Sequence, residues 1–208
     1  MRNLSFSLFN VVSIALIILL IVLIIVPFNL GDVEQAQRIA KWINVYERVN
    51  YSFDLFKIHN GAIVPDLQKK VELSEDVYLE MLVPYLNVKE DSKIKKHKYR
   101  LNNGRGIEKH SQFYFSNFKE TKDGCYVSIR ERQNTILDEN RPLYYMFIDI
   151  NGKEKPNRVG QDIFFINIYK DKISAVGDKE KHAKLKANCS PIGTGFYCSE
   201  YYLHSGSL

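Results

Sequence analysis

The hydrophobic residues of this 208-residue chain are concentrated in one run near its N-terminus. Residues 3–31 contain no Asp, Glu, Lys, Arg or His, and residues 11–28 are almost all Val, Ile, Leu and Ala. A helix over residues 6–28 would be about 34 Å long, which is enough to cross a hydrocarbon core of about 30 Å. No A-x-A cleavage site of a secretory signal peptide follows the run. We therefore predict a helix that anchors the chain in a membrane.

An amphipathic pattern continues this helix beyond the apolar run. Pro27 should kink the helix at the membrane edge without ending it. Asn60 and Gly61 are typical of a helix end. The two halves would form one helix from about Phe6 to His59, roughly 80 Å if unbroken. Its second half carries apolar residues at three-and-four spacing: Ala36, Ile39, Trp42, Ile43, Tyr46, Val49, Phe53 and Phe56.

The rest of the chain changes from a short helix to β-strand patterns. Ser74 can cap a short helix that ends before Pro84. Four later segments are rich in aromatic and β-branched residues and predict strands: 112–118, 126–130, 143–150 and 162–169. The predicted fold class is α+β, with a long N-terminal helix packed on a C-terminal antiparallel sheet. Residues 31–208 would form the extracytoplasmic domain, including the helix up to about residue 60.

The net charge of +5 raises the question of a nucleic-acid partner. The run Lys93-Ile94-Lys95-Lys96-His97-Lys98-Tyr99-Arg100 is the candidate site. We favour a solvated loop for this run, since a membrane anchor argues against a role on DNA inside the cell. A surface fibre that captures DNA would fit both the charge and the anchor.

Three cysteines indicate an oxidising compartment. Cys189 and Cys198 flank a turn-rich loop, and a disulfide between them would contribute about 2.5 to 3 kcal/mol of stability by loop closure. Cys125 is then left over, either as a buried thiol or as an alternative partner. Because the chain contains no C-x-x-C motif, a zinc or thioredoxin-type site has little support.

The N-terminal residues resemble those of type IV pilins and the pseudopilins of type II secretion. In that family a short basic leader ending in Gly precedes Phe-Thr-Leu-Ile-Glu, an apolar run and a proline about twenty residues on. Here Ser5-Phe6-Ser7-Leu8-Phe9-Asn10 stands in that place and Pro27 takes the position of the family proline. The resemblance extends to Val33-Glu34-Gln35-Ala36-Gln37, Val83-Pro84-Tyr85-Leu86 and the segment from Phe147 to Asp162.

This resemblance implies specific roles for the N-terminal residues. A prepilin peptidase would cut between Ser5 and Phe6, which makes residues 1–5 a leader, although the family glycine is replaced by Ser5. Asn10 replaces the family glutamate, whose carboxylate is thought to pair with the N-terminal amine of a neighbouring subunit. The helix of residues 6–30 would bind the same helix of other pilin-like subunits. Loss of the glutamate points to a minor subunit.

Calcium is the cofactor that the resemblance suggests, because several pseudopilins are similar in binding it near their C-terminal sheet. Asp149 and Asn151 begin like a calcium loop, and Asp162 could add an oxygen ligand. However, Lys153 stands where an EF-hand needs Asp or Asn. We favour a turn between two strands at this position and keep calcium as the alternative.

Taken together, these patterns predict a structural subunit of a type IV pilus or a type II secretion pseudopilus. The chain would be a single-pass protein of the inner membrane, with its domain outside the cytoplasm and a place in a cell-surface filament. The alternative is a single-pass membrane-anchored protein whose outer domain binds a ligand. No Gly-x-Ser-x-Gly or His-Glu-x-x-His motif is present, so we expect no catalytic activity.

Overall fold

The computed structural model describes residues 8–64, 74–90, 92–94, 96–109, 111–132 and 141–205, without the side chains of residues 8–10 and 22–32. It contains two compact units, Met1–Gln37 and Arg38–Leu208, and the first helix contributes to both. The helices and strands, in chain order, are α1 (Leu8–Asn60), α2 (Glu75–Leu82), β1 (Lys119–Glu120), β2 (Tyr126–Glu131), β3 (Tyr144–Asp149), β4 (Ile163–Ile168), β5 (Ile173–Ala175), α3 (His182–Asn188) and α4 (Cys198–Ser205).

The long N-terminal helix is confirmed: the described residues Leu8–Asn60 form α1, which continues through Pro27. Among the helices whose residues are described, none combines the length and the apolar character needed to cross a membrane. The structure does not describe the side chains of residues 8–10 and 22–32, many of which belong to the predicted span. The membrane span therefore remains a prediction.

Local signals in the sequence set the ends of the first two helices. At the end of α1, Gly61 takes a positive φ of 80°, and its N–H donates to the Lys57 carbonyl at 2.8 Å. The Asn60 amide also donates, to the Phe56 carbonyl. At the start of α2, the Ser74 side chain accepts from the Val77 N–H, as predicted for its cap.

The core of Arg38–Leu208 is a five-stranded antiparallel sheet in the order β1-β2-β3-β4-β5. The central strand β3 pairs with β2 and β4, so that Phe147 lies opposite Ser128 and Phe165. Every residue of β3 and β4 is buried, because both faces of the sheet are covered. The predicted antiparallel sheet is therefore present, and three of its strands match predicted segments.

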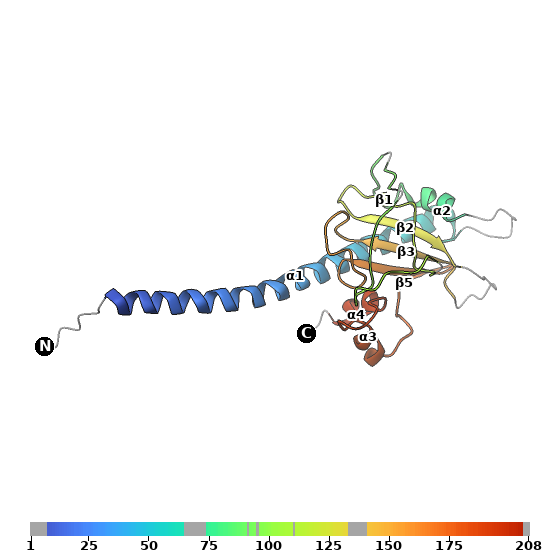
Figure 1. Ribbon diagram of the computed structural model, residues 1–208. Coiled ribbons are helices and arrows are strands. Elements are labelled where there is room, and N and C mark those ends of the chain that lie inside the picture. The colour runs from blue at the N-terminus through green and yellow to red at the C-terminus, as the bar shows by residue number, and fades with distance from the viewer. Residues whose placement is uncertain are drawn as a thin grey trace. The chain divides into compact units, whose positions relative to one another are not determined.

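Alternate residues of each strand pack into two separate hydrophobic clusters. On one face, Met146, Ile148 and Phe164 pack with the apolar stripe of α1 and with α2. On the other face, Phe147 and Phe165 pack with an irregular segment that includes Phe113 and Phe115. Figure 1 shows α1 and this irregular segment on opposite faces of the sheet.

Other predictions differ from the structure in detail. Residues 112–118 form no strand; their aromatic side chains instead cover the sheet, and Asn117 takes a positive φ of 58°. Aromatic density indicated burial correctly, but it did not specify the backbone conformation. The short strand β5 and the C-terminal helices α3 and α4 were not predicted.

Candidate functional site

The residues assigned to processing and assembly fall on parts of the chain with little described detail. Ser5 and Phe6 lie outside the described residues. Asn10 and Pro27 lie within α1, but their side chains are outside the described ones. The cleavage and pairing roles that the resemblance implies for these four residues therefore stay predictions.

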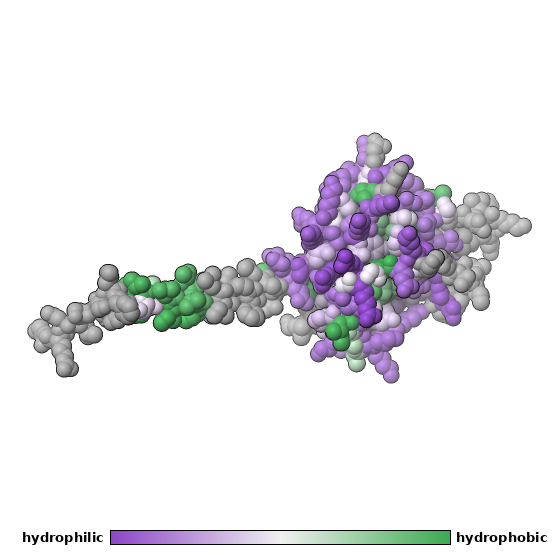
Figure 2. Space-filling view, in the orientation of Figure 1, coloured by the Kyte–Doolittle hydropathy of each residue, from purple (hydrophilic) through white to green (hydrophobic). Residues whose placement is uncertain are grey.

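The described part of the N-terminal unit is a helix segment with apolar side chains on every side. Its large hydrophobic side chains are each 48–56% exposed: Val11, Val12, Ile14, Leu16, Ile17, Ile18, Leu19, Leu20 and Ile21. Six of them are consecutive, and successive helical residues are about 100° apart, so they surround the helix completely. Figure 2 shows this hydrophobic segment, and it shows a mainly hydrophilic surface on Arg38–Leu208. A helix that is apolar all round requires an apolar environment on all its sides.

Trp42 fixes the second half of α1 to the sheet and to the C-terminus. Its side chain is fully buried and stacks on Phe164 of β4, with 4.4 Å between the ring centroids. The indole Nε1–H donates to the carbonyl of Ser199 at 2.9 Å. The Ser199 hydroxyl in turn accepts from the N–H of Phe165 at 2.8 Å. Trp42 of α1 thus contacts both β4 and α4.

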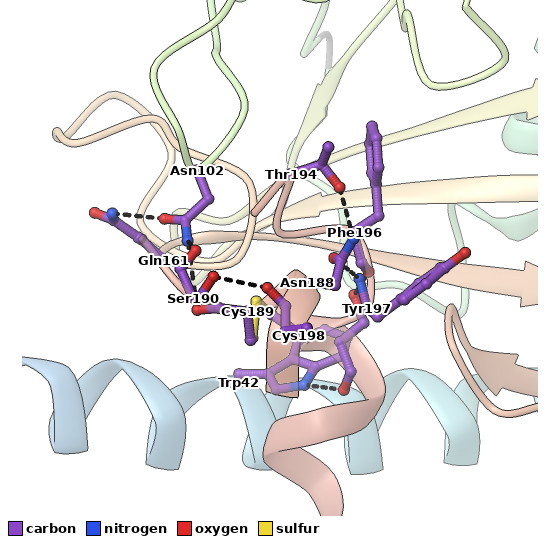
Figure 3. Close-up of a disulfide and its surroundings, with 12 residues drawn as sticks. Trp42, Asn102, Gln161, Asn188, Cys189, Ser190, Thr194, Phe196, Tyr197 and Cys198 are labelled. Carbon is purple, nitrogen blue, oxygen red and sulfur yellow. Dashed lines mark hydrogen bonds between the residues drawn. A yellow bond between two sulfur atoms is a disulfide. The ribbon is translucent and has the colours of Figure 1, made fainter. Parts of the chain in front are cut away.

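A disulfide closes the C-terminal turn beside Trp42. Cys189 and Cys198 are bonded, as predicted, and Cys198 is fully buried in the core that contains Trp42. In Figure 3, the indole of Trp42 projects from α1 towards the disulfide. Cys125 is a buried free thiol, and its burial raises the pKa of the thiol to about 11.

Hydrogen bonds hold the disulfide-closed turn in one conformation. Within the turn, the Asn188 amide donates to the Thr194 hydroxyl, and its oxygen accepts from the Tyr197 N–H (Figure 3). Outside it, the Asn102 amide donates to the Ser190 carbonyl at 2.8 Å. Ile192 at the tip is 86% exposed. The turn is therefore held in place by hydrogen bonds and presents the side chain of Ile192 to solvent.

The residues of the predicted calcium loop come together at the ends of β3 and β4. Asp149 and Asp162 are both fully buried. Asp149 accepts from the N–H groups of Asn151 and Gly152 at 3.0 and 2.9 Å. Asp162 accepts from the N–H groups that begin the return to β4, those of Asn157 at 2.6 Å and Arg158 at 2.7 Å.

His97 completes this cluster from a distant segment of the chain. Its Nε2 lies 2.7 Å from Oδ2 of Asp149, and only 8% of its side chain is exposed. Burial raises the pKa of Asp149, and the hydrogen bond from His97 opposes this effect. Burial and the neighbouring Asp149 charge raise the pKa of Asp162 to about 6.

These contacts favour a structural role for the cluster. Both carboxylate oxygens of Asp149 and both of Asp162 already accept a hydrogen bond from the protein. In the described part of the chain, no group of three or more His, Cys, Asp and Glu residues is arranged to hold a metal ion. Calcium at Asp149, Asn151 and Asp162 stays a prediction, and the favoured turn between two strands is present.

Sequence reasoning missed two residues that organise these sites, His97 and Ser199. His97 stands in the basic run, where it was assigned to a solvated loop. The alternation Lys96-His97-Lys98-Tyr99-Arg100-Leu101 is the signal that could have identified it, because alternate residues of extended backbone face opposite sides. Ser199 bonds to Trp42 through its backbone carbonyl, which leaves no trace in the sequence, and its hydroxyl accepts from a residue 34 positions away.

Comparison with known proteins adds no relative: no family model, no curated protein and no solved structure matches this chain.

Proposed function

We propose that this chain is a structural subunit of a pilin-like filament. In this proposal the apolar segment of α1, residues 11–21, packs against the same segment of neighbouring subunits and holds the chain in the membrane before assembly. The domain Arg38–Leu208 forms the outer surface of the filament.

The observation that carries this proposal is the exposure of apolar side chains around the whole circumference of residues 11–21. α1 is the only element in the described part of Met1–Gln37, so this unit offers the segment no partner of its own. A monomeric soluble protein rarely leaves such a surface exposed. Neighbouring helices of the same kind would cover it on all sides, as would lipid.

The second half of α1 supports the same proposal. Its buried stripe, which includes Trp42, Val45, Val49 and Phe53, packs on the sheet and leaves a single continuous helix leading into the N-terminal unit. The domain therefore covers the apolar stripe in the second half of α1, whereas in this proposal the apolar side chains of residues 11–21 are covered by neighbouring subunits.

Cysteine crosslinking in the protein's own cells tests the proposal. Cysteines replace Ile14 and Leu20 in the full chain, and a bifunctional thiol reagent is added at native expression. Two reactive sites per subunit produce a ladder of dimers, trimers and larger species if subunits stack. The ladder should disappear in an Ile17→Asn background and persist in a matched Glu47→Lys background. Only monomers and dimers in all three backgrounds would refute assembly.

A ligand-binding protein with a single-pass anchor is the second candidate, and a cavity favours it. This cavity of about 420 Å³ lies between α1 and the sheet edge, with an apolar side that includes Val45 and Val127. Arg48 and Asp123 form a salt bridge at 2.5 Å among its lining residues. This candidate predicts a protein that never forms the ladder and that loses ligand binding on Arg48→Ala.

A further inference from the structure

The basic run that suggested a solvated loop is an ordered, extended segment with two distinct faces. Lys96, Lys98 and Arg100 are exposed, whereas His97 and Tyr99 between them face the domain. Alternation of this kind is that of extended backbone, in which every second residue recurs at about 6.7 Å. The three cations therefore form a regular series along one line.

The inward residues hold this segment to the sheet. His97 bonds to the buried carboxylate of Asp149, as described above. The Tyr99 hydroxyl donates to the Phe113 carbonyl and accepts from the Phe115 N–H, both at 2.8 Å. Fixed anchors reduce the conformational freedom that a ligand would otherwise have to remove on binding. The cations are thus presented by a rigid support.

A fourth cation, Arg158, lies next to the last of the three. Arg100 and Arg158 are partners in a parallel bridge: the Arg100 N–H donates to the Asn157 carbonyl at 3.1 Å, and the Val159 N–H donates to the Arg100 carbonyl at 2.9 Å. Bridge partners project from the same face, and like charges placed side by side in this way are destabilising. The hydrogen bonds of this bridge are all made by backbone groups, so the bridge itself does not use either guanidinium group.

Carboxylates of the domain do not neutralise these charges. Among the described residues, the salt bridges involve other cations, and none includes Lys96, Lys98, Arg100 or Arg158. The carboxylates of Asp149 and Asp162, which bond to His97 and to the Arg158 N–H, are buried and accept hydrogen bonds from backbone N–H groups. Four fixed cations without acidic partners favour an anion from outside the chain.

We propose that Lys96, Lys98, Arg100 and Arg158, the cation row, bind the phosphate backbone of a nucleic acid. The phosphates of a DNA strand repeat at a regular interval, so a regular row of cations can contact several of them at once. The guanidinium groups of Arg100 and Arg158 suit bidentate contacts with phosphate oxygens. A lipid surface spreads its charges over two dimensions and would require a broad basic patch rather than a single row.

The row supplies charge and no means of reading bases, so binding should be independent of sequence. This inference goes beyond the filament proposal and does not depend on it, because the cation row lies wholly within the domain. Assembly of subunits would multiply the row along a fibre and increase avidity. A single chain already carries the complete row.

The test measures binding of the full chain, kept in a non-ionic detergent, to a short fluorescent DNA duplex of arbitrary sequence. Four phosphate contacts predict a slope of log affinity against log salt of about −3.6, or roughly a hundredfold loss of affinity between 50 and 200 mM salt. The variant Lys98→Ala/Arg100→Ala should bind at least tenfold more weakly, with a slope smaller by about two. The matched variant Lys170→Ala/Lys186→Ala removes the same charge from exposed positions elsewhere and should bind as the parent does.

Three results would overturn the proposal. The first is an equal loss of affinity in both double variants, which would mean that net charge alone drives binding. The second is tighter binding to polyglutamate or to vesicles containing phosphatidylserine than to the duplex. The third is no binding of the duplex at 50 mM salt. Circular dichroism and thermal unfolding of each variant show whether the domain is intact, and Lys98→Gln/Arg100→Gln repeats the test if the alanine variant unfolds.

Discussion

Removal of the disulfide tests how much the C-terminal turn contributes to the domain. We predict that the variant Cys189→Ala/Cys198→Ala folds but is less stable than the parent chain. Alanine is chosen because Cys198 is fully buried, so a serine there would add a buried hydroxyl without a designed partner.

The magnitude follows from the length of the loop that the bond closes. The two cysteines have a sequence separation of nine, and for a loop of this length closure removes entropy from the unfolded chain worth about 2.5 to 3 kcal/mol at 25 °C. For a domain of this size, 1 kcal/mol changes the melting temperature by roughly 2 to 4 °C. The melting temperature should therefore fall by about 5 to 12 °C.

Urea unfolding of the full chain in detergent, followed by Trp42 fluorescence, measures the change directly. Trp42 is the only tryptophan and lies beside the disulfide, so its signal reports on the affected part of the core. Two controls accompany the variant: the parent chain unfolded with a reductant should give the same free energy as the double variant, and Cys125→Ala should retain the sensitivity to reductant.

The reasoning would be refuted by a free energy of unfolding within about 0.5 kcal/mol of the parent, which is the range of an ordinary surface substitution. Such a result would mean that residual structure already keeps the two ends of the turn close together in the unfolded ensemble, so that the bond removes little entropy.

Three further predictions concern the buried polar groups. Trp42→Phe should lower the free energy of unfolding by about 1 to 3 kcal/mol, because the buried carbonyl of Ser199 loses its donor, and a urea titration measures this. His97→Ala should cost about 3 to 5 kcal/mol, since Asp149 stays buried without its partner; an undiminished urea midpoint would contradict the pairing. Burial raises the pKa of Asp162 from its ordinary value of 3.8 to about 6 in the folded chain, so the folded state keeps this proton at pH values where the unfolded chain has lost it. The free energy of unfolding should therefore fall as the pH rises from about 4 to 6, by up to about 3 kcal/mol. Asp162→Asn should remove this part of the pH dependence, which urea midpoints at the two pH values compare.

The long helix and the central strands could be predicted because their signals are local. The stripe that includes Trp42 and Phe53 repeats with the helical period, and Asn60-Gly61 ends it. The strands β3 and β4 are runs rich in aromatic and β-branched residues, and their lack of regular polar alternation agrees with burial on both faces.

Short elements could not be predicted because they depend on tertiary contacts. The helix α3 has seven residues and no side-chain cap, so little in its own sequence distinguishes it from a loop. The strand β5 has three residues and exists through its pairing with β4. The segment containing Phe113 and Phe115 is buried like a strand, yet it adopts irregular backbone.

The candidate sites divide in the same way. Cys189 and Cys198 are close in sequence, so their pairing could be predicted. His97 and Asp149 are 52 residues apart and meet only because the basic segment crosses the end of β3. The basic composition of that segment predicted a solvent-exposed loop. This is correct for Lys96, Lys98 and Arg100 but wrong for His97 and Tyr99, which face the domain.

The hydrogen bond between Trp42 and Ser199 joins positions 157 residues apart, and this has a consequence for biosynthesis. At about 5 to 20 residues per second, the ribosome needs roughly 8 to 30 seconds to make the chain between them. Until the end of that interval the apolar stripe of α1 exists without α4, and for most of it also without β4, the two elements that later cover Trp42. The order of synthesis therefore places the apolar stripe of α1 first and its protein cover last, so we expect the newly made chain to expose this stripe until its C-terminal residues have been translated.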